Sequence, residues 1–303
     1  MIVDSPAAFR AAIAAGEFPP AHRATARAAL LVSPIGFRLA EDSATDNLYM
    51  QLGEGVSEER ALAEHARLAA ALSQTLPVLT LPGSFDTPDA VFPNNAFATV
   101  PGRLIVGSMR HPVRRLESAR RDVHSLFSEL FAYQIEAIPP ESTAELTGPL
   151  VIDRARNIGF CGLAERCDRA GAEAMHEAFG LDLTFVFDLA AGEYHTNVFM
   201  AVLAGRALVV HEASFADAAV PRAIAELYGE RVTWLTDAEK GAFVGNCIAL
   251  SDVAVWMSER AAGVLTASHR AEIESWGFTI RSVPLAEIEK AGGSLRCCVA
   301  EIY

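Results

Sequence analysis

Polar residues of chemically useful types recur along the chain at steps of 48, 50, 50, 51 and 51 residues. The series contains a cysteine, a histidine and a glutamate, which are the parts of an enzyme with a thiol nucleophile. The alternative is that the spacing arises by chance, because Asn, Glu and His are common residues. The members of the series are Asn47, Asn95, Glu145, His195, Asn246 and Cys297.

Three of these residues have definite chemical roles. A free thiol has a pKa of about 8.5, so Cys297 needs a lowered pKa or a bound cation before it can attack at neutral pH. An imidazole with a pKa of about 6.5, such as that of His195, can protonate a leaving group near neutrality. A carboxylate beside the histidine, here Glu145, orients the ring and favours its charged form.

The elements that must position these residues repeat in the order strand, strand, helix, strand. A repeat of about fifty residues with this content indicates blades around an axis. We therefore expect an α/β fold, a pseudo-symmetric propeller of five ββαβ units whose equivalent positions converge on the axis. Strands are predicted at 29–33, 77–81, 96–100, 103–107, 149–153, 184–188, 197–203, 206–211, 232–235, 253–257 and 278–283, and helices at 57–75, 112–130, 168–180, 215–229 and 258–275.

No linker, low-complexity tract or charge block divides the sequence. We expect one catalytic domain over residues 1–303, with residues 1–26 as an N-terminal extension that contains a short surface helix. Asp4 stands early in this extension and no basic stretch precedes its apolar residues, which argues against a secretory signal.

The composition indicates a well-buried soluble protein. Of the 303 residues 51% are hydrophobic, and 25 basic against 38 acidic side chains give a net charge of −13. This acidity makes nucleic acid and anionic membranes poor partners, and no apolar run reaches the roughly 18 residues of a membrane helix. The odd number of cysteines without metal-site spacing suggests a reduced, cytoplasmic protein. Four cysteines are expected to be buried small apolar residues: Cys161, Cys167, Cys247 and Cys298.

Five motifs together resemble a known superfamily. They are PDAVFPNNAFAT (88–99), ELTGPLVIDR (145–154), GLAER (162–166), YHTNV (194–198) and GGSLRC (292–297). In this order they are similar to motifs of the guanidino-group-modifying superfamily, which includes arginine deiminase, dimethylarginine dimethylaminohydrolase, agmatine deiminase, succinylarginine dihydrolase and glycine amidinotransferase. The likeness extends over residues 29–303 and is strongest to the bacterial amidinotransferase-like, citrulline-utilisation hydrolases. It implies the five-bladed α/β propeller called the pentein fold.

The resemblance gives the catalytic roles above to the same cysteine, histidine and glutamate, and it adds substrate contacts. Asp89 corresponds to an acid that contacts the substrate α-amino group. Arg114, which lies 114 − 95 = 19 residues after Asn95, and Arg166 correspond to a clamp for the substrate carboxylate. Arginine suits a carboxylate because it binds it bidentately. The alternatives are salt-bridged arginines and an acid that caps a helix.

Amides stand where this superfamily usually has acids. Asn95, and Asn197 two residues after the histidine, replace aspartates of the deiminases, and ELTG replaces the commoner Glu-Gly-Gly-Asp. An amide has both a donor and an acceptor and suits a neutral ureido group, whereas a carboxylate pairs with a guanidinium. We therefore expect a ureido substrate or intermediate, contacted by these two amides and by Asn94, Asn47 and Asn246.

These observations predict a cysteine-dependent hydrolase that acts on the C–N bonds of a ureido or guanidino group of an arginine- or citrulline-like amino acid, through a covalent intermediate on Cys297. The alternatives are an amidinotransferase that passes the amidino group to an amine, and a binding protein that has lost turnover. The predicted partner is a small-molecule substrate. No metal or organic cofactor is expected, and a homodimer is compatible with the sequence.

Overall fold

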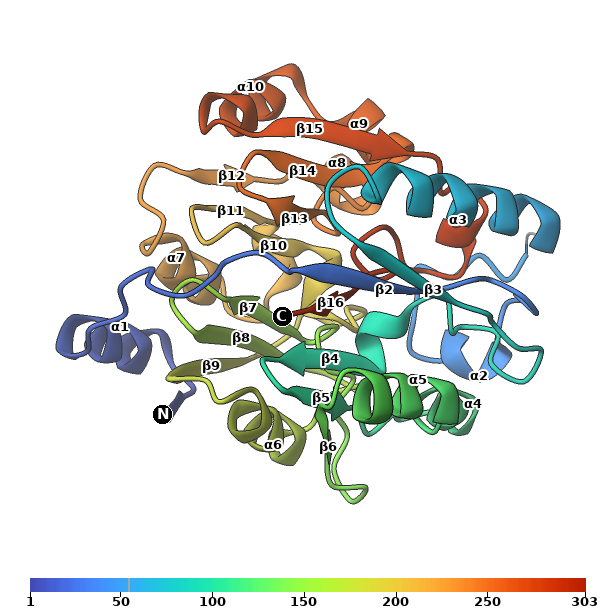
Figure 1. Ribbon diagram of the computed structural model, residues 1–303. Coiled ribbons are helices and arrows are strands. Elements are labelled where there is room, and N and C mark those ends of the chain that lie inside the picture. The colour runs from blue at the N-terminus through green and yellow to red at the C-terminus, as the bar shows by residue number, and fades with distance from the viewer. Residues whose placement is uncertain (54) are drawn as a thin grey trace.

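The computed structural model describes residues 1–53 and 55–303, and its strands form five small mixed sheets. In each sheet two strands pair antiparallel, and one of them also pairs in parallel with a third strand and so lies in the middle. Figure 1 shows the sheets gathered around the middle of the molecule, with most of the helices toward its outside. The α/β class and the ββαβ content of the repeat are thereby confirmed.

Four units are continuous in the sequence, each built from a hairpin, a helical connection and a parallel third strand. In chain order their elements are β4 (Phe97–Val100), β5 (Arg103–Val106), α4 (Pro112–Ser118), α5 (Arg121–Ser125) and β6 (Gln134–Ala137); β7 (Leu150–Asp153), β8 (Ile158–Leu163), α6 (Arg169–Phe179) and β9 (Leu183–Asp188); β10 (Met200–Leu203), β11 (Ala207–Val210), α7 (Ala219–Ala225) and β12 (Val232–Trp234); and β13 (Ile248–Ser251), β14 (Ala254–Ser258), α9 (Glu259–Val264), α10 (Ala267–Ser275) and β15 (Thr279–Val283).

The remaining unit is assembled from both ends of the chain. β16 (Ala300–Ile302) pairs antiparallel with β2 (Ala28–Val32), which pairs in parallel with β3 (Val78–Leu81) after α3 (Glu58–Leu72). This pairing places the end of the sequence in the middle of the molecule, where Figure 1 marks the C-terminus. β16 contacts β4, and β10 contacts both β7 and β13, so the first strands of neighbouring units lie together as inner strands.

Local sequence explains several of these elements. Every residue of β4 and of β11 is buried, as expected for strands covered on both faces. Helix α6 begins at Asp168, whose side chain accepts a hydrogen bond from the Gly171 amide, and ends at Gly180 in the left-handed conformation with φ of 62°. These two residues fix both ends of the helix.

Each of the eleven predicted strands is present, with ends shifted by a few residues. Five strands were not predicted: β1 (Ile2–Val3), β6, β8, β13 and β16. Two glycines interrupt the apolar pattern of β8, and β6 is half polar, so neither has a strong strand signal. The helix predicted at 112–130 is divided into α4, α5 and a π-helical segment, Leu126–Leu130.

The N-terminal extension is attached to the β7–β9 unit. β1 adds a fourth strand to that sheet beside β9, and α1 (Pro6–Ala15) provides the expected short helix. Phe9 on α1 is 1% exposed and stacks on Phe185 with ring centres 4.7 Å apart. Among the described residues, no helix is both long and apolar enough to cross a membrane.

Shorter elements complete the structure. They are the helices α2 (Glu41–Ala44) and α8 (Asp237–Gly241) and the 3-10 turns Pro93–Asn95, Thr196–Val198, Glu212–Ser214 and Ile288–Lys290.

Candidate active site

Five residues of the polar series lie shortly before the five inner strands. Asn95 precedes β4, Glu145 precedes β7, His195 precedes β10, Asn246 precedes β13 and Cys297 precedes β16. Because the inner strands lie together, the beginnings of these strands bring residues from the whole sequence to one end of the molecule. The fifty-residue spacing therefore corresponds to one structural position in each unit.

Asn47 does not share that position, and its predicted equivalence is wrong. It lies between β2 and β3, because the inner strand of its unit is β16 from the end of the chain. Asn47 nevertheless faces the site: a Cβ on Gly292, which has φ of +77°, would lie 2.5 Å from the Asn47 amide nitrogen. Only glycine allows both this backbone conformation and this close approach.

A narrow cavity contains six of the predicted residues. Its volume of about 10 Å³ is close to the space of one water molecule. Ser43 and Met50, from the segment Glu41–Met50, also line it, so this segment covers the cavity. The predicted residues in the cavity are Asn47, Asp89, Asn95, Arg114, Arg166 and Cys297.

Cys297 is 1% exposed and is surrounded by amides. Asn246 Nδ2 donates to Cys297 Sγ at 3.3 Å, and Asn197 Nδ2 lies 3.8 Å from the same sulfur. The Cys297 backbone N–H in turn donates to Asn246 Oδ1 at 3.4 Å. Burial raises the pKa of the Cys297 thiol, although the Asn246 contact acts in the opposite direction. The raised pKa favours the neutral thiol.

Glu145 is fully buried beside three cationic or basic groups. Its Oε2 lies 3.1 Å from His195 Nε2, 3.5 Å from Arg166 Nη1 and 3.6 Å from Arg114 Nη1. Burial by itself would raise the pKa of Glu145, but Arg166, His195 and Arg114 outweigh it and the pKa is lowered. Glu145 is thus a carboxylate, which holds the ring of His195 electrostatically.

The surroundings of His195 favour a neutral ring. Burial lowers its pKa to about 4, against the raising effect of Glu145. Neither ring nitrogen of His195 reaches hydrogen-bond geometry with a described residue, although Nε2 is close to Glu145. A neutral imidazole with a free nitrogen can accept a proton, which is the property needed in a general base.

Gly148 is a site residue that was not predicted. A Cβ at this position would lie 2.6 Å from His195 Cε1 and 2.7 Å from both ring nitrogens. The imidazole therefore occupies space that any side chain at residue 148 would fill. The one sequence signal for Gly148 was that it stands where the Glu-Gly-Gly-Asp pattern of the superfamily has its final Asp.

The two predicted clamp arginines are buried and already paired. Arg114 Nη2 lies 2.7 Å from Glu117 Oε2 within α4, and Arg166 Nη2 lies 2.6 Å from Asp46 Oδ1. Arg166 Nη2 also donates to the Ser43 carbonyl at 2.6 Å. Arg166 thereby holds the covering segment to the cavity. The pairing partners Glu117 and Asp46 were not predicted, because they belong to no motif.

Comparison with known proteins agrees with this geometry. Residues 33–303 match the family described as N,N dimethylarginine dimethylhydrolase, eukaryotic. The chain belongs to this family. The predicted superfamily is confirmed, and within it the match is to the dimethylarginine dimethylhydrolase family rather than to arginine deiminase. No curated protein matches the sequence.

Solved structures share the fold of this family member at low identity. The substrate-bound N-terminal domain of ArgZ, an arginine dihydrolase from cyanobacteria, has a TM-score of 0.79 at 20% identity, over 91% of this chain and 97% of that one. Unliganded AgrE has a TM-score of 0.79 at 19% identity, over 91% of this chain and 39% of the AgrE chain. A dimethylarginine dimethylaminohydrolase variant, as an adduct with S-methyl-L-thiocitrulline, has a TM-score of 0.72 at 20% identity, over 91% of this chain and 99% of that one.

Three acceptor oxygens at the site of this family member have no hydrogen-bond donor among residues 1–53 and 55–303. They are Asp89 Oδ1, Asn95 Oδ1 and Glu145 Oε1, and all three are buried. The other oxygen of Asp89, Oδ2, accepts a hydrogen bond from Ser43 Oγ at 2.6 Å. A buried acceptor without a donor is costly. The site is therefore suited to a ligand that brings several N–H groups.

Asn94 and Asn197, for which substrate contact is predicted, do not line this cavity. Asn94 Nδ2 donates to Thr147 Oγ1 at 3.3 Å, and Asn197 Nδ2 donates to the Thr147 carbonyl at 2.9 Å. Asn246 also lies outside the cavity lining, behind the sulfur. Of the two amides that replace deiminase aspartates, Asn95 alone lines the cavity.

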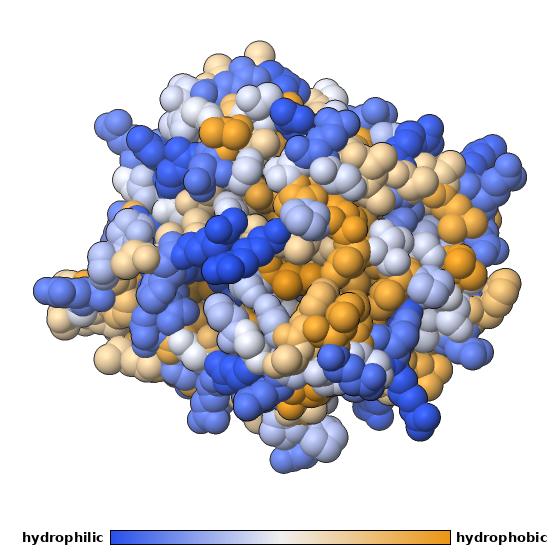
Figure 2. Space-filling model, in the orientation of Figure 1, coloured by the Kyte–Doolittle hydropathy of each residue, from blue (hydrophilic) through white to orange (hydrophobic). Residues whose placement is uncertain are grey.

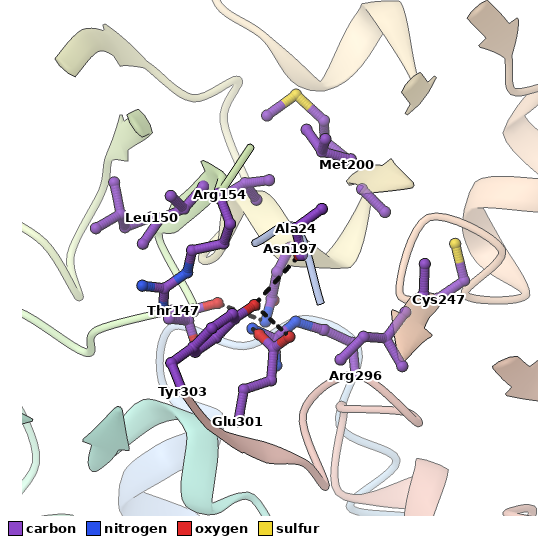
Figure 3. A pocket seen from close by; sticks show the side chains of 16 residues that line it. Ala24, Thr147, Leu150, Arg154, Asn197, Met200, Cys247, Arg296, Glu301 and Tyr303 are labelled. Carbon is purple, nitrogen blue, oxygen red and sulfur yellow. Dashed lines mark hydrogen bonds and ion pairs between the residues drawn. The ribbon is translucent and has the colours of Figure 1, made fainter. Parts of the chain in front are cut away.

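Asn197 and Thr147 line a second cavity, of about 50 Å³, which is drawn in Figure 3. Its other side chains include Arg296, whose Nη2 donates to Glu301 Oε2 at 2.9 Å, and Tyr303. Asn197 thus separates this second cavity from Cys297. Within the described ranges, no group of three His, Cys, Asp or Glu side chains could hold a metal ion.

Proposed function

We propose that this family member is a hydrolase of guanidino C–N bonds in an arginine-like compound, with Cys297 as the nucleophile. The observation that best supports it is that Cys297 shares one cavity with Asp89, Arg114 and Arg166, while the pair of Glu145 and His195 adjoins those arginines. The related structures favour the same chemistry. One ArgZ variant is covalently bound to a reaction intermediate.

The charges favour a guanidinium as the head group. Its five N–H groups could donate to Asn95 Oδ1 and Glu145 Oε1, two of the three acceptor oxygens that lack donors, and the Glu145 carboxylate would supply countercharge. The third, Asp89 Oδ1, would accept from the substrate α-amino group. A ureido group has fewer N–H donors and no charge. The amides of Asn95 and Asn47 line the cavity, and they support a second stage in which a ureido product is hydrolysed further, as in a dihydrolase or a citrulline hydrolase.

The resting protonation states define the first step. The Cys297 thiol is neutral and so is His195, so the thiol proton passes to the imidazole as the cationic substrate binds near the sulfur. The thiolate attacks the central guanidino carbon and forms a C–S bond. His195 returns the proton to the departing nitrogen, the C–N bond breaks, and an amidino group remains on the sulfur.

Water completes the reaction. His195, neutral again, removes a proton from a water molecule, which attacks the same carbon. The C–S bond breaks and the thiol is restored. For arginine the balance is one water consumed and one ammonium released, with citrulline as the ureido product. Asp89 would hold the α-amino group, while Arg114 and Arg166 would share their positive charge with the substrate carboxylate.

A substrate panel tests the proposal. Arginine, citrulline, methylarginines, agmatine and succinylarginine are incubated with the enzyme and with Cys297→Ser, and products are identified by mass spectrometry. We expect turnover of a guanidino substrate, and an enzyme adduct of the corresponding mass on Cys297. Full turnover by Cys297→Ser would reject the mechanism. Amidino transfer to added glycine in place of hydrolysis would identify a transferase, and binding without any adduct would identify a binding protein.

We further propose that the five units close into a ring, as in a five-bladed propeller, and that the chain forms one catalytic domain. Contacts of β16 with β4, and of β10 with β7 and β13, support closure. The convergence of residues fifty positions apart around Cys297 supports it independently, since Asn197 and Asn246 both contact its sulfur.

A further inference from the structure

A groove rich in arginine lies at the opposite end of the inner strands from the active site. The active-site residues precede these strands, whereas the groove is formed by the turns that follow β7 and β10. Residues 20–25, which lead into β2, and Arg231, which precedes β12, complete it. Its open volume is about 800 Å³. The groove is thus a separate feature of the molecule.

The floor of the groove is rigid. Gly205, in the turn after β10, has φ of +65°, and a Cβ on it would lie 2.4 Å from Ala155 Cβ in the turn after β7. Arg156 Nη1 donates to the Gly205 carbonyl at 2.6 Å and so ties the two turns together. Two adjacent turns therefore present Arg156 and Arg206 in fixed positions.

Positive charge dominates the groove, although the net charge of the whole chain is −13. Four arginines and His22 line it, against the single acid Asp252. Figure 2 shows a strongly hydrophilic cluster left of centre, over the region where Figure 1 places the chain that leads into β2. The four arginines are Arg23, Arg156, Arg206 and Arg231.

Most of this charge has no acidic partner, although Arg23 Nε donates to the Thr25 carbonyl and Arg206 Nη2 to the Asp252 carbonyl. Arg156 pairs with Asp153 at 2.8 Å, but none of Arg23, Arg206 and Arg231 forms an ion pair within residues 1–53 and 55–303. Arg206 Nε is buried and donates to no described residue. Clustered guanidinium groups repel one another, and an anion between them would remove that cost.

The shape and lining of the groove define the ligand class. Arginine forks match phosphate oxygens bidentately, and several forks around one hollow suit a ligand with more than one phosphate. Pro20, Leu227 and Tyr228 add apolar surface beside the arginines, which suits an organic group attached to the phosphates. We infer that this groove binds a small molecule that carries a di- or triphosphate group.

This site would act apart from the guanidino chemistry. The inference does not rest on the proposed function, because no groove residue touches Cys297, His195 or the active-site cavity. Ala24 lines both the groove and the cavity of Figure 3, whose inner wall is Asn197. Arg154, another lining residue of that cavity, stacks 4.3 Å from the centre of the Tyr303 ring and extends the positive surface.

Titration calorimetry with ADP, inorganic triphosphate and citrate tests the inference on the full chain. We expect saturable binding of ADP and triphosphate that weakens as salt concentration increases, and much weaker binding of citrate. Arg23→Gln and Arg231→Gln should each weaken phosphate binding about tenfold or more, because each removes a charge-assisted contact. Both side chains are exposed, so neither replacement should disturb folding. ADP binding tighter than triphosphate would show that the organic group also contributes.

The matched control is Arg67→Gln, which removes an exposed arginine from α3. It should leave phosphate binding unchanged, and none of the three variants should alter turnover of the guanidino substrate. Absence of saturable binding, equal binding of citrate, or an equal loss in Arg67→Gln would overturn the inference. A chain that binds ADP but turns over no guanidino compound would instead reject the proposed function and leave the groove standing.

Discussion

At the scale of single residues, burial protects the reactive sulfur. Burial raises the pKa of Cys297, and burial also keeps His195 uncharged with a pKa of about 4. A thiol and a neutral imidazole form a pair that becomes reactive when a cation arrives, because positive charge near the sulfur stabilises the thiolate. We therefore expect the chemistry to depend on the binding of a guanidinium, and the free thiol to react slowly with other electrophiles.

These protonation states predict how activity depends on pH. Values of kcat/KM report groups of the free enzyme, and the proton of the Cys297 thiol is the one that His195 later gives to the departing nitrogen. Activity should therefore stay level near neutral pH and decrease at alkaline pH, as the raised pKa of Cys297 is passed. His195 should cause no loss between pH 5 and 8, because its pKa is about 4. Asn246→Ala removes an N–H donor from the sulfur and should move this alkaline decrease to higher pH.

The control for this profile is Asn94→Ala, whose amide contacts Thr147 and not the sulfur. Its pH profile should match that of the unaltered enzyme. A bell-shaped profile centred near pH 6 would contradict the assigned protonation states, since it would require a charged histidine as the resting acid.

Gly148 provides a second test at the residue scale. Gly148→Ala adds one methyl group where the His195 ring lies, at 2.6 Å from Cε1. We expect kcat to fall about a hundredfold or more, because general acid–base catalysis contributes that much and depends on position. Steady-state kinetics with circular dichroism would separate displacement of the ring from unfolding.

Gly263→Ala is the matched control for this replacement. A Cβ at Gly263, on α9, meets no atom within 4 Å, so the same change should be silent there. Equal activity of Gly148→Ala and the unaltered enzyme would mean that His195 has no positional role in the reaction.

At the scale of elements, the segment Glu41–Met50 controls access to the cavity. Asp46 on this segment contacts Arg166 at 2.6 Å, His111 at 2.9 Å and Arg110 at 3.3 Å. The cavity below it has room for about one water. We therefore expect the segment to move when a substrate enters, and the ion pairs of Asp46 with Arg166 and Arg110 to favour its return.

Asp46→Ala tests this closing role. Removing the carboxylate should raise KM for the guanidino substrate about tenfold, with a smaller change in kcat, because the segment no longer closes on Arg166. Limited proteolysis should cleave the segment faster in this variant. Asp42→Ala, which alters an exposed acid on α2, is the control and should behave like the unaltered enzyme. A lower KM in Asp46→Ala would show that Asp46 competes with substrate instead.

At the scale of the whole molecule, both ends of the chain join units that are distant in sequence. β16 supplies the inner strand of the unit that contains β2 and β3, and β1 pairs with β9. Helix α1 is also anchored to the β7–β9 unit, because Phe9 packs between Phe185 and Phe160. The extension therefore contributes to stability far from the reactive sulfur.

Phe9→Ala should lower the free energy of unfolding by about 3–5 kcal/mol, the usual effect of removing a buried phenyl ring. Urea denaturation followed by fluorescence would measure this change. The kcat of the remaining folded enzyme should be unaltered, because α1 contacts no active-site residue. Phe85→Ala, at a position 68% exposed, is the control and should change stability by less than about 0.5 kcal/mol. A similar effect of both replacements would show that α1 is not anchored by Phe9.

The sequence by itself determined the repeating units and the positions that approach the sulfur. Apolar runs located eleven strands, because a buried strand must be apolar whatever surrounds it. The fifty-residue spacing brought Glu145 beside His195 and Asn246 beside Cys297, because equal steps along repeated units return to the same structural position. The motifs then identified the superfamily. The sequence pattern was sufficient to locate these residues because the same structural position recurs in each unit.

Only the tertiary structure decided where the charges pair and where the amides point. Arg166 is bound by Asp46, 120 residues away, and Asn197 turns to Thr147 and the sulfur instead of the substrate. The pairing of β16 with β2 likewise joins the two ends of the sequence. Such contacts depend on distances of a few ångströms between side chains of separate elements. Neither periodicity nor composition encodes these distances, so the sequence could not show that Asn95 lines the cavity of Cys297 while Asn197 lines the second cavity.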